Sequence, residues 1–452
     1  MGRELLAGWG RTAPTAADVC RPASDADAVA ALAGAPARGA VARGLGRSYG
    51  DAAQNAGGTV ISTARLEGLT WVDEAAGVVR AAGGASLAGV MALLSPHGRA
   101  LCVVPGTRHV TVGGAVAADV HGKNHPADGS FARHVVELTL ATPGGLRHLT
   151  PAGNPDLFWA TAGGMGLTGV VVDATLSTMA VETEAVRVVS RRAGDLDEVM
   201  AAMDAEAGRH RYAVAWLDGL AKGRATGRGV VGWGDHAGAG DLPPAWQAEP
   251  SRRSVAVPPW LAGLRVPGPA VAALNQVRYH RSRAADTTTV EPLDRFLFPL
   301  DAVDGWNRLY GPAGFVQYQF VVPFAAGDVV RTALERLRDA GCPPFLAVLK
   351  RMGAADPGPL SFPMPGWTLA LDFPTATAGL AGVLDALDEV VAGAGGRVYL
   401  AKDARLRPEL VGAMYPAVDR WREVQRDVDP AGVLTSDLGR RLGLVRPRAG
   451  AG

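Results

Sequence analysis

The sequence predicts an α+β fold in two domains followed by a shorter C-terminal part. The chain has 452 residues, which is longer than a single hydrophobic core usually grows, so two domains are expected. Short strand patterns separated by glycine turns fill the first part, whereas longer strand patterns alternate with amphipathic helices in the second. We therefore predict domains at 1–182 and 183–396, with a C-terminal segment at 397–452.

Each element of the first domain follows from a local pattern. Ser24 or Asp25 can cap a helix before an apolar period, and Pro143-Gly144-Gly145 joins two alternating runs into a hairpin. A β-branched run near the end of the domain predicts one long strand. In order, the sequence predicts a helix at 24–35, strands at 39–46 and 57–66, a strand and a helix within 76–98, the hairpin at 135–151 and the long strand at 166–181.

The second domain is predicted to hold an antiparallel sheet with helices covering one face. Apolar residues alternate with Gln317 and Gln319, as in a strand with two different faces. Residues 242–286 are rich in Pro, Arg and Trp without a clear period, which predicts a long flexible loop. The other predicted elements are a helix and a strand within 194–220, strands at 315–324 and 367–374, and helices at 328–341 and 379–396.

Composition narrows the class of protein. Apolar residues make up 48% and charged residues 20% of the chain, and the formal net charge is +1, so no strong field favours nucleic acid or acidic membranes. Cys20, Cys102 and Cys342 are too far apart in the sequence for a metal or redox pair. We find no signal-peptide pattern and no apolar run long enough to span a bilayer, so we expect a cytoplasmic location.

Three glycine-rich segments, at 42–51, 105–126 and 161–172, favour a nucleotide ligand when they are taken together. The first places Arg47 among glycines, which suits either a phosphate cradle or an ordinary tight turn. It is neither a G-x-G-x-x-G motif nor a P-loop. Small residues in the second leave room for a large flat group, although a close-packed protein seam is the alternative. Their clustering is typical of a dinucleotide that lies extended across a domain.

His121 and His125 raise the question of a metal site. Zinc would need both side chains on one helical face, and Gly122 and Pro126 argue against a helix there. A catalytic loop and a structural turn both remain open.

Several segments resemble the decaprenylphosphoryl-β-D-ribose 2′-oxidases, a family of the vanillyl-alcohol oxidase / p-cresol methylhydroxylase superfamily. The resemblance runs in order from about residue 8 to residue 442 and is loose only between 190 and 295. The segments that carry it are GWGRTAP, ARGLGRSYGD, PGTRHVTVGGAVAADVHGKNH, FWATAGGMGLTG, YGPAGFVQYQF, PLSFPMPGW, YLAKD and AMYP.

The resemblance implies that the first domain is a two-subdomain FAD-binding domain, that the second binds substrate, and that 397–452 returns to the first. Tyr49 stands where some relatives carry a histidine bonded to the flavin, so FAD is expected to be non-covalent. The implied FAD-binding residues are Gly44, Leu45, Gly46, Arg47, Ser48, Pro105, Gly106, Thr107, Thr111, Gly114, Ala115, Gly122, Asn124, Gly166, Val171 and Tyr399.

The same resemblance implies that Lys402 and His121 act on the substrate at the flavin ring. The chemistry is removal of a hydride from an alcohol carbon to flavin N5, which also requires a group that takes up the hydroxyl proton. Either residue could take that proton. The implied substrate-binding residues are Tyr49, Gln317, Gln319, Lys350, Trp216, Thr368 and Ala370.

The implied activity is oxidation of the 2′-hydroxyl of a polyprenyl-phosphoryl ribose. This is the first half of an epimerisation to the arabinose donor of cell-wall arabinan, and a separate NADH-dependent short-chain reductase would complete it. A soluble sugar, nucleoside or alditol is the alternative substrate. A flavin-free binding protein is a third reading, which the presence of His121 and Lys402 weakens.

Departures from the family pattern motivate the alternative substrate. Ala370 replaces the cysteine that nitroaromatic inhibitors trap in the family, and Thr368 replaces an asparagine. Leu297 and Phe298 are expected to make one pocket wall more apolar, and Asp128 is an added carboxylate. Residues 257–271 include Trp260, Leu261 and Leu264 near Arg252 and Arg253, which suits either a peripheral membrane contact or a covered domain seam.

Overall fold

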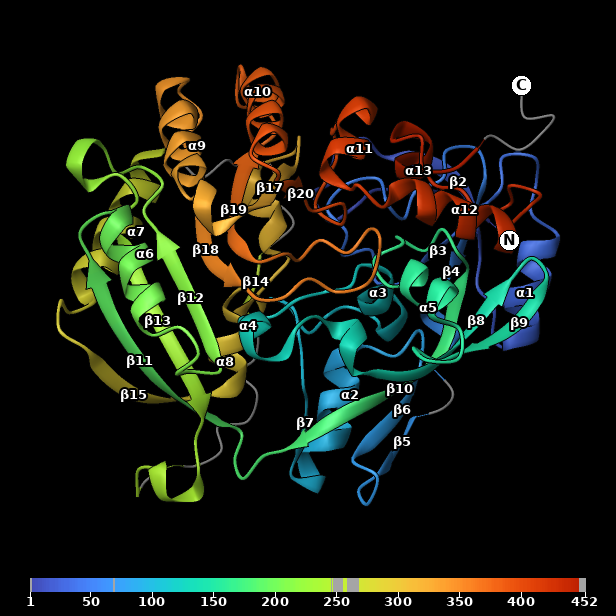
Figure 1. The fold of residues 1–452 in the computed structure, drawn as a ribbon, viewed down its shortest axis with the longest axis horizontal. Coiled ribbons are helices and arrows are strands. Elements are labelled where there is room, and N and C mark those ends of the chain that lie inside the picture. Colours follow the sequence, from blue (N-terminus) through green and yellow to red (C-terminus); the bar gives the residue numbers. More distant parts are fainter. Residues whose placement is uncertain (1, 68–69, 245, 247–254, 258–267, 447–452) are drawn as a thin grey trace.

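The computed structural model describes residues 2–67, 70–244, 246, 255–257 and 268–446 (Figure 1). Three β-sheets organise these residues, with a small parallel pair of β14 (Val255–Ala256) and β16 (Val303–Asp304) beside them. The predicted α+β class is therefore confirmed.

The first sheet has four strands and lies near the N-terminus. Its order is β1 (Gly2–Leu6), β2 (Thr15–Cys20), β4 (Thr59–Ser62) and β3 (Ala40–Arg43). Helix α1 (Asp25–Ala33) packs nearby, and Ser24 caps it because its hydroxyl accepts a hydrogen bond from Asp27 N. The predicted helix and both predicted strands are confirmed.

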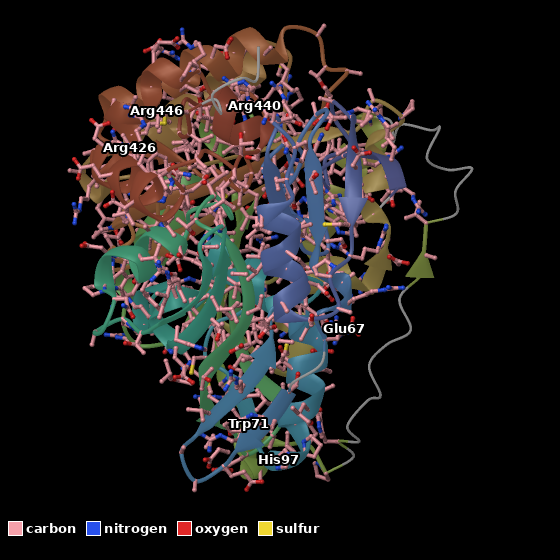
Figure 2. All side chains as sticks on the ribbon, turned by 90° about the vertical axis from the view of Figure 1, so that its right-hand side faces the viewer. Glu67, Trp71, His97, Arg426, Arg440 and Arg446 are labelled. Carbon is pink, nitrogen blue, oxygen red and sulfur yellow. The ribbon has the colours of Figure 1, made fainter. Side chains whose placement is uncertain are left out.

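The second sheet carries the long strand and the hairpin that the sequence predicts. Its order is β5 (Thr70–Asp73), β6 (Val78–Ala82), β10 (Val170–Ala180), β8 (Val135–Thr142) and β9 (Gly145–Leu149), and β7 (Arg99–Leu101) also pairs with β10. Trp71 of β5 is 43% exposed at the end of the molecule away from Arg440 (Figure 2). Short helices accompany this sheet: α2 (Leu87–Leu94), α3 (Val112–Ala117), α4 (His125–Asp128) and α5 (Pro155–Thr161).

The third sheet has eight antiparallel strands, as predicted for the second domain. Its order is β15 (Thr287–Pro292), β11 (Ala185–Ala193), β13 (Gly229–His236), β12 (Tyr212–Leu217), β18 (Leu346–Met352), β19 (Gly366–Pro374), β17 (Phe315–Val322) and β20 (Arg397–Val398). One face packs against α6 (Leu196–Ala205), α9 (Asp328–Asp339) and α10 (Leu380–Gly393), and α9 and α10 lie side by side (Figure 1).

Strand alternation gives this sheet two distinct faces. Ala347 and Leu349 of β18 are buried in the core beneath the helices, whereas Leu346, Val348 and Lys350 point to the opposite side. That second face forms one wall of the cavity described below.

The prediction of a flexible loop at 242–286 is wrong for its last part, because α7 (Gly268–Arg281) lies there. Asn275 Nδ2 donates to Asp218 Oδ1 over 2.8 Å, and the Arg278 guanidinium lies 4.7 Å from the centre of the Trp216 ring. These contacts with β12 and with Asp218, the residue after it, hold in place a helix whose own sequence shows no clear apolar period. The positions proposed for membrane contact at 260–264 lie outside the described residues.

The C-terminal segment contacts the first sheet. Ala40 N donates to Val433 O, Thr435 N donates to Ala40 O, and Arg440 donates to Asn55 Oδ1. The domain boundaries at 182/183 and 396/397 stay predictions, although β10 and β11 are joined by a short turn at 181–184. The remaining helices are α8 (Leu293–Leu297), α11 (Val411–Met414), α12 (Val418–Val428) and α13 (Asp437–Arg441).

The described helices are short. The longest, α7 and α10, have 14 residues each. Across the ranges that the structure describes, no helix combines the length and the apolar character needed to cross a membrane.

Asp429 offers a test of how the C-terminal segment is held. Its buried carboxylate accepts hydrogen bonds from Val433 N over 2.9 Å and from Leu434 N over 2.6 Å. Asp429→Ala leaves these buried N–H groups unpaired, so we expect the free energy of unfolding to fall by about 2–4 kcal/mol. Chemical denaturation of the FAD-loaded protein measures this. Asp427→Ala removes an exposed carboxylate on the same helix and should stay within about 0.5 kcal/mol of wild type. Equal stabilities for the two variants would contradict the assignment.

Candidate functional site

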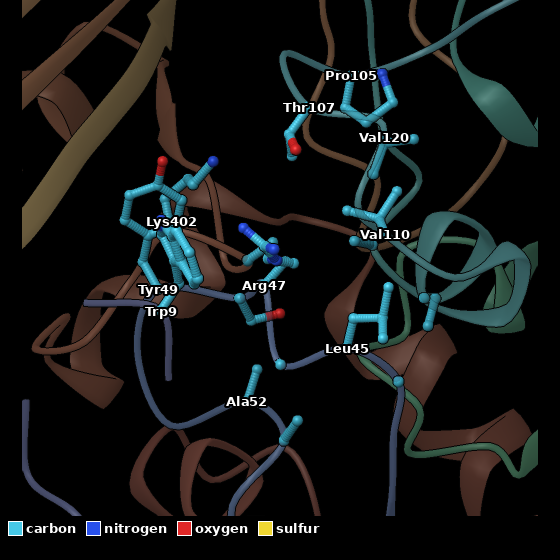
Figure 3. A pocket seen from close by; sticks show the side chains of 18 of the residues that line it. Trp9, Leu45, Arg47, Tyr49, Ala52, Pro105, Thr107, Val110, Val120 and Lys402 are labelled. Atoms are coloured by element: carbon cyan, nitrogen blue, oxygen red, sulfur yellow. The ribbon is translucent and has the colours of Figure 1, made fainter. Parts of the chain in front are cut away.

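A cavity of about 280 Å³ lies between the glycine-rich loops and the open face of the third sheet. Figure 3 shows Trp9, Tyr49 and Lys402 on one side and Pro105, Val110 and Val120 on the other. Most of the predicted site residues meet here. They are Lys402, His121, Tyr49, Gln317, Gln319, Lys350, Ala370, Gly44, Leu45, Gly46, Arg47, Ser48, Pro105, Gly106, Thr107, Thr111, Gly114, Gly166, Val171 and Tyr399.

The loop at 44–48 is shaped by its glycines. Gly46 has φ +65°, a conformation that side chains disfavour. A Cβ on Gly44 would lie 2.3 Å from Thr111 Oγ1, so only glycine allows this approach. The Arg47 guanidinium stacks on Trp9, 3.8 Å from the ring centre, which places a fixed positive charge at the cavity wall.

Helix α3 decides which small residues of the second glycine segment face the cavity. Thr111 caps the helix by accepting a hydrogen bond from Gly114 N over 3.0 Å. Gly114 and Ala117 share one helical face and line the cavity. Ala115 lies on the opposite face, fully buried in the protein core, so it does not line the cavity as the sequence prediction required.

Gly122 and Asn124 also lie outside the cavity lining, because they support the loop that carries His121. Asn124 Nδ2 donates to Cys102 O over 2.7 Å and to Asp128 Oδ2 over 2.5 Å. A Cβ on Gly122 would lie 2.3 Å from Asn124 Oδ1. The two residues therefore fix the loop from behind, and the added carboxylate of Asp128 belongs to that support.

The sheet wall presents alternate residues of three strands. Gln319 lies opposite Ala370, and Ala370 lies opposite Val348, so all three side chains point to the cavity. Trp216 lies opposite Val348 one strand further on, where Arg278 covers it. Trp216 therefore does not line the cavity.

The cavity lining also does not include Thr368, Leu297 or Phe298. Thr368 lies behind Gln319 and accepts a hydrogen bond from its amide over 3.3 Å. Leu297 and Phe298 are buried at the end of α8 in a different part of the core. Their place at the cavity is taken by Leu300, so the prediction that they form a pocket wall is wrong.

His121 is buried and neutral at ordinary pH. Burial lowers its pKa well below the usual value, and the nearby charges of Lys350, His125 and Lys402 lower it further. The Gln319 amide donates to His121 Nε2 over 3.0 Å, and the His121 ring lies 5.2 Å from that of Tyr399.

Tyr399 connects the C-terminal segment to the third sheet and to the residue after α3. Its hydroxyl donates to Ala118 O over 2.7 Å, its backbone N–H donates to Gln319 O over 2.9 Å, and its ring stacks on Phe362 at 4.7 Å. Lys402 follows one turn later, so Tyr399 sets where Lys402 enters the cavity.

Lys402 lies over the face of Tyr49, with Nζ 3.8 Å from the ring centre. Burial lowers its pKa to about 7; the nearby Asp372 carboxylate raises that value, and the charge of Lys350 lowers it. The backbone N–H of Tyr49 donates to Ala401 O over 3.0 Å, which holds the two residues together although they are far apart in the sequence.

Asp372 is a site residue that the sequence analysis missed. Its carboxylate accepts hydrogen bonds from Gln317 over 2.5 Å and from Tyr310 over 3.0 Å. Burial raises its pKa to about 6, an effect that these hydrogen bonds and Lys402 oppose. Asp372 lies two residues after Ala370 on the same strand. Because side chains alternate along a strand, the sequence could have predicted that both point to the same face. Trp306, which packs against Trp9 at the cavity rim, had no such local signal.

Comparisons with known proteins agree with this geometry. Residues 16–150 match the FAD binding domain family. Decaprenylphosphoryl-beta-D-ribose oxidase of Mycolicibacterium smegmatis is 42% identical over 450 residues, 97% of each chain. A Streptomyces coelicolor protein described as uncharacterized is 45% identical over 365 residues, 78% of this chain and 98% of its own. Alditol oxidase of a Streptomyces species is 32% identical over 163 residues, 36% of this chain and 39% of its own.

The cavity fits FAD. Its lining runs from Ala42 and Thr63 near the first sheet to Lys350 on the third, so it suits an extended ligand. A Cβ on Gly106 would meet no protein atom within 4 Å, which leaves free space directly against the backbone. Arg47 supplies a positive charge along this path for an anionic group.

Tyr49 leads to a prediction about how FAD is held. A phenol cannot form a histidyl bond to the flavin, and burial raises the pKa of Tyr49 well above its usual value, so its oxygen stays protonated. We expect acid precipitation to release all yellow colour into the supernatant. Colour that stays with the washed pellet, or a peptide carrying the mass of FAD, would contradict non-covalent binding.

Proposed function

Because the chain belongs to the family of the decaprenylphosphoryl-β-D-ribose oxidases, we propose that it oxidises the 2′-hydroxyl of a polyprenyl-phosphoryl ribose to the 2′-keto sugar. It is an FAD-dependent oxidoreductase that acts on a CH–OH group. The observation that carries the proposal is the 42% identity to a ribose oxidase across 97% of both chains. A separate NADH-dependent reductase would reduce the keto product to the arabinose epimer, and a lipid-linked substrate would bring the protein to the membrane surface.

The glycine loops would hold the cofactor. Residues 44–48 would contact the pyrophosphate through backbone N–H groups and the Arg47 charge, while Gly106 and Gly114 would give the flavin room. Ala115, Gly122 and Asn124 would act through the loops they brace. When bound, FAD accepts the hydride from the sugar carbon.

Lys402 is the better candidate for taking the hydroxyl proton. General bases work best when their pKa lies near the working pH, and the pKa of Lys402 is lowered to about 7. His121 has a pKa well below its usual range and is the weaker base. The ammonium formed on Lys402 would be stabilised by the Tyr49 ring 3.8 Å away.

His121 and Thr368 orient Gln319 toward the sugar. The amide nitrogen of Gln319 uses both hydrogens, one toward His121 Nε2 and one toward Thr368 Oγ1. Its carbonyl oxygen is then left as an acceptor for a substrate hydroxyl. Thr368 therefore contributes without reaching the cavity, and Ala370 beside it leaves space but offers no nucleophile.

The substrate proposal is tested by anaerobic reduction of the bound flavin. We expect farnesylphosphoryl-β-D-ribose to bleach the flavin absorbance, because its ribose is β-linked to a phosphate and carries the 2′-hydroxyl. The 2′-deoxy analogue is the matched control and should leave the colour intact. Bleaching by soluble ribosides or alditols but not by the farnesyl compound would overturn the proposal in favour of a soluble substrate.

The pH dependence of that reduction tests the role of Lys402. The neutral amine is the active form, so the limiting rate should fall about tenfold per pH unit below the pKa of Lys402 and level off above it. Lys402→Arg stays protonated and should lose about 100- to 10,000-fold, while FAD absorbance is retained. Lys222→Met, at an exposed lysine, is the control. A rate that is highest at low pH would exclude Lys402 as the base.

A further inference from the structure

Lysine is rare in this chain and is concentrated in one place. Of the 45 Lys and Arg residues, only four are lysines: Lys123, Lys222, Lys350 and Lys402. Lys350 and Lys402 line the cavity. Lys123, two residues after His121, lies outside that lining but near enough to Lys350 for the charge of Lys350 to lower its pKa. Nearly all other basic residues of the chain are arginines. A lysine differs from an arginine in that its compact charge can be lost on burial, and we infer that Lys123, Lys350 and Lys402 use this property.

Lys123 and Lys350 are held close together by the third sheet. Lys123 O accepts a hydrogen bond from Ala213 N of β12 over 2.9 Å. Lys350 belongs to β18, which pairs directly with β12. The ammonium of Lys123 donates to Phe296 O and lies 4.5 Å from the centre of the Phe296 ring. Among the residues that the structure describes, its two other hydrogens have no acceptor.

Arg278 continues this row of positive charge. Its guanidinium lies over the Trp216 ring on β12. Trp216 is the cross-strand neighbour of Val348 on β18, and Val348 lines the cavity. In the described part of the chain, no carboxylate pairs with Arg278, Lys123 or Lys350. Burial lowers the pKa of Lys123, the charges of Lys350 and Arg278 lower it further, and Glu291 opposes this effect.

We propose that Lys350, Lys123 and Arg278 form the subsite for the phosphate of the sugar substrate, with the ribose between them and Lys402. The inference rests on the proposed function. It adds the residues that bind the phosphodiester of the substrate to those that act on its 2′-hydroxyl. Three donors without a carboxylate partner suit a tetrahedral anion.

Helix α7 extends the subsite in the direction a lipid would take. Leu274 lies one turn before Arg278 on the same side of the helix, and it is 65% exposed. Val277 beside it is 54% exposed. An isoprenoid chain attached to the phosphate would find an apolar surface directly beyond Arg278.

Lysines suit a site that is empty between turnovers. Burial lowers the pKa of Lys350 to about 8 and that of Lys123 to about 7, so the empty site sheds charge near neutral pH. An arriving phosphate favours the charged forms and draws protons from solution. Arginines at these positions would stay charged, at a cost in desolvation.

Titration calorimetry with farnesyl phosphate tests the subsite without any oxidation. At pH 8, run in HEPES and in Tris, wild-type binding should take up between about 0.5 and 1.5 protons. Lys350→Met and Lys123→Met should each weaken binding about 10- to 100-fold and reduce the proton uptake. Lys350→Arg should restore affinity but leave proton uptake reduced to the share of Lys123, and Lys222→Met should match wild type. Farnesol should bind far more weakly, and inorganic phosphate should bind measurably but less tightly because it lacks the lipid.

Equal affinities for farnesol and farnesyl phosphate, or wild-type binding by both Met variants, would overturn the subsite. Failure of the proposed function looks different, because farnesyl phosphate would still bind while farnesylphosphoryl ribose failed to bleach the flavin. A substrate comparison completes the test. The ratio of kcat/KM for farnesylphosphoryl ribose to that for methyl β-D-ribofuranoside should fall about 30-fold in Lys350→Met, and an unchanged ratio would contradict the proposal.

Discussion

The arrangement of the site depends on Tyr399. Its backbone is hydrogen-bonded to Gln319 of the third sheet, its hydroxyl to Ala118 after α3, and its ring packs against His121. These contacts bring together three stretches of chain that lie far apart in the sequence, with Ala118 281 residues before Tyr399. Lys402 follows Tyr399 by one turn, and its backbone N–H donates to Tyr399 O over 2.9 Å, so its position relative to His121 is set by this residue. A buried tyrosine with its hydroxyl satisfied gives a rigid joint at little entropic cost.

Burial determines the protonation of the ionisable side chains at the cavity. Lys402, Lys350 and His121 lie within electrostatic range of one another, and burial together with mutual repulsion lowers the pKa of Lys402 and His121. Asp372 opposes this effect at Lys402 alone. The result is a set of groups with different proton affinities in one small volume, which is a common way for one site to hold a base, a neutral hydrogen-bonding ring and an anion receptor.

Local patterns in the sequence predicted most elements correctly because strand alternation, helix caps and glycine turns act over a few residues. The errors came from long-range contacts. Helix α7 has no clear apolar period, although basic residues in its last turn are compatible with a helix, and the contacts of Asn275 and Arg278 with Asp218 and Trp216 hold it in place. Ala115 was placed at the flavin by resemblance, whereas α3, which starts after the Thr111 cap, directs it into the core. Trp216 was placed in the cavity by resemblance, and only the tertiary structure shows Arg278 covering it.

The alternation of β17, β18 and β19 has a consequence for how this enzyme can diversify. Core residues such as Leu349 and Phe320 point toward the helices, while Gln319, Val348 and Ala370 point toward the ligand. Mutations in the second set change the shape and polarity of the recognition surface without altering the packed core. Selection for new substrates can therefore act on every other residue of these strands, while selection for folding acts on the remaining residues. Substrate specificity can then change at a small cost in stability.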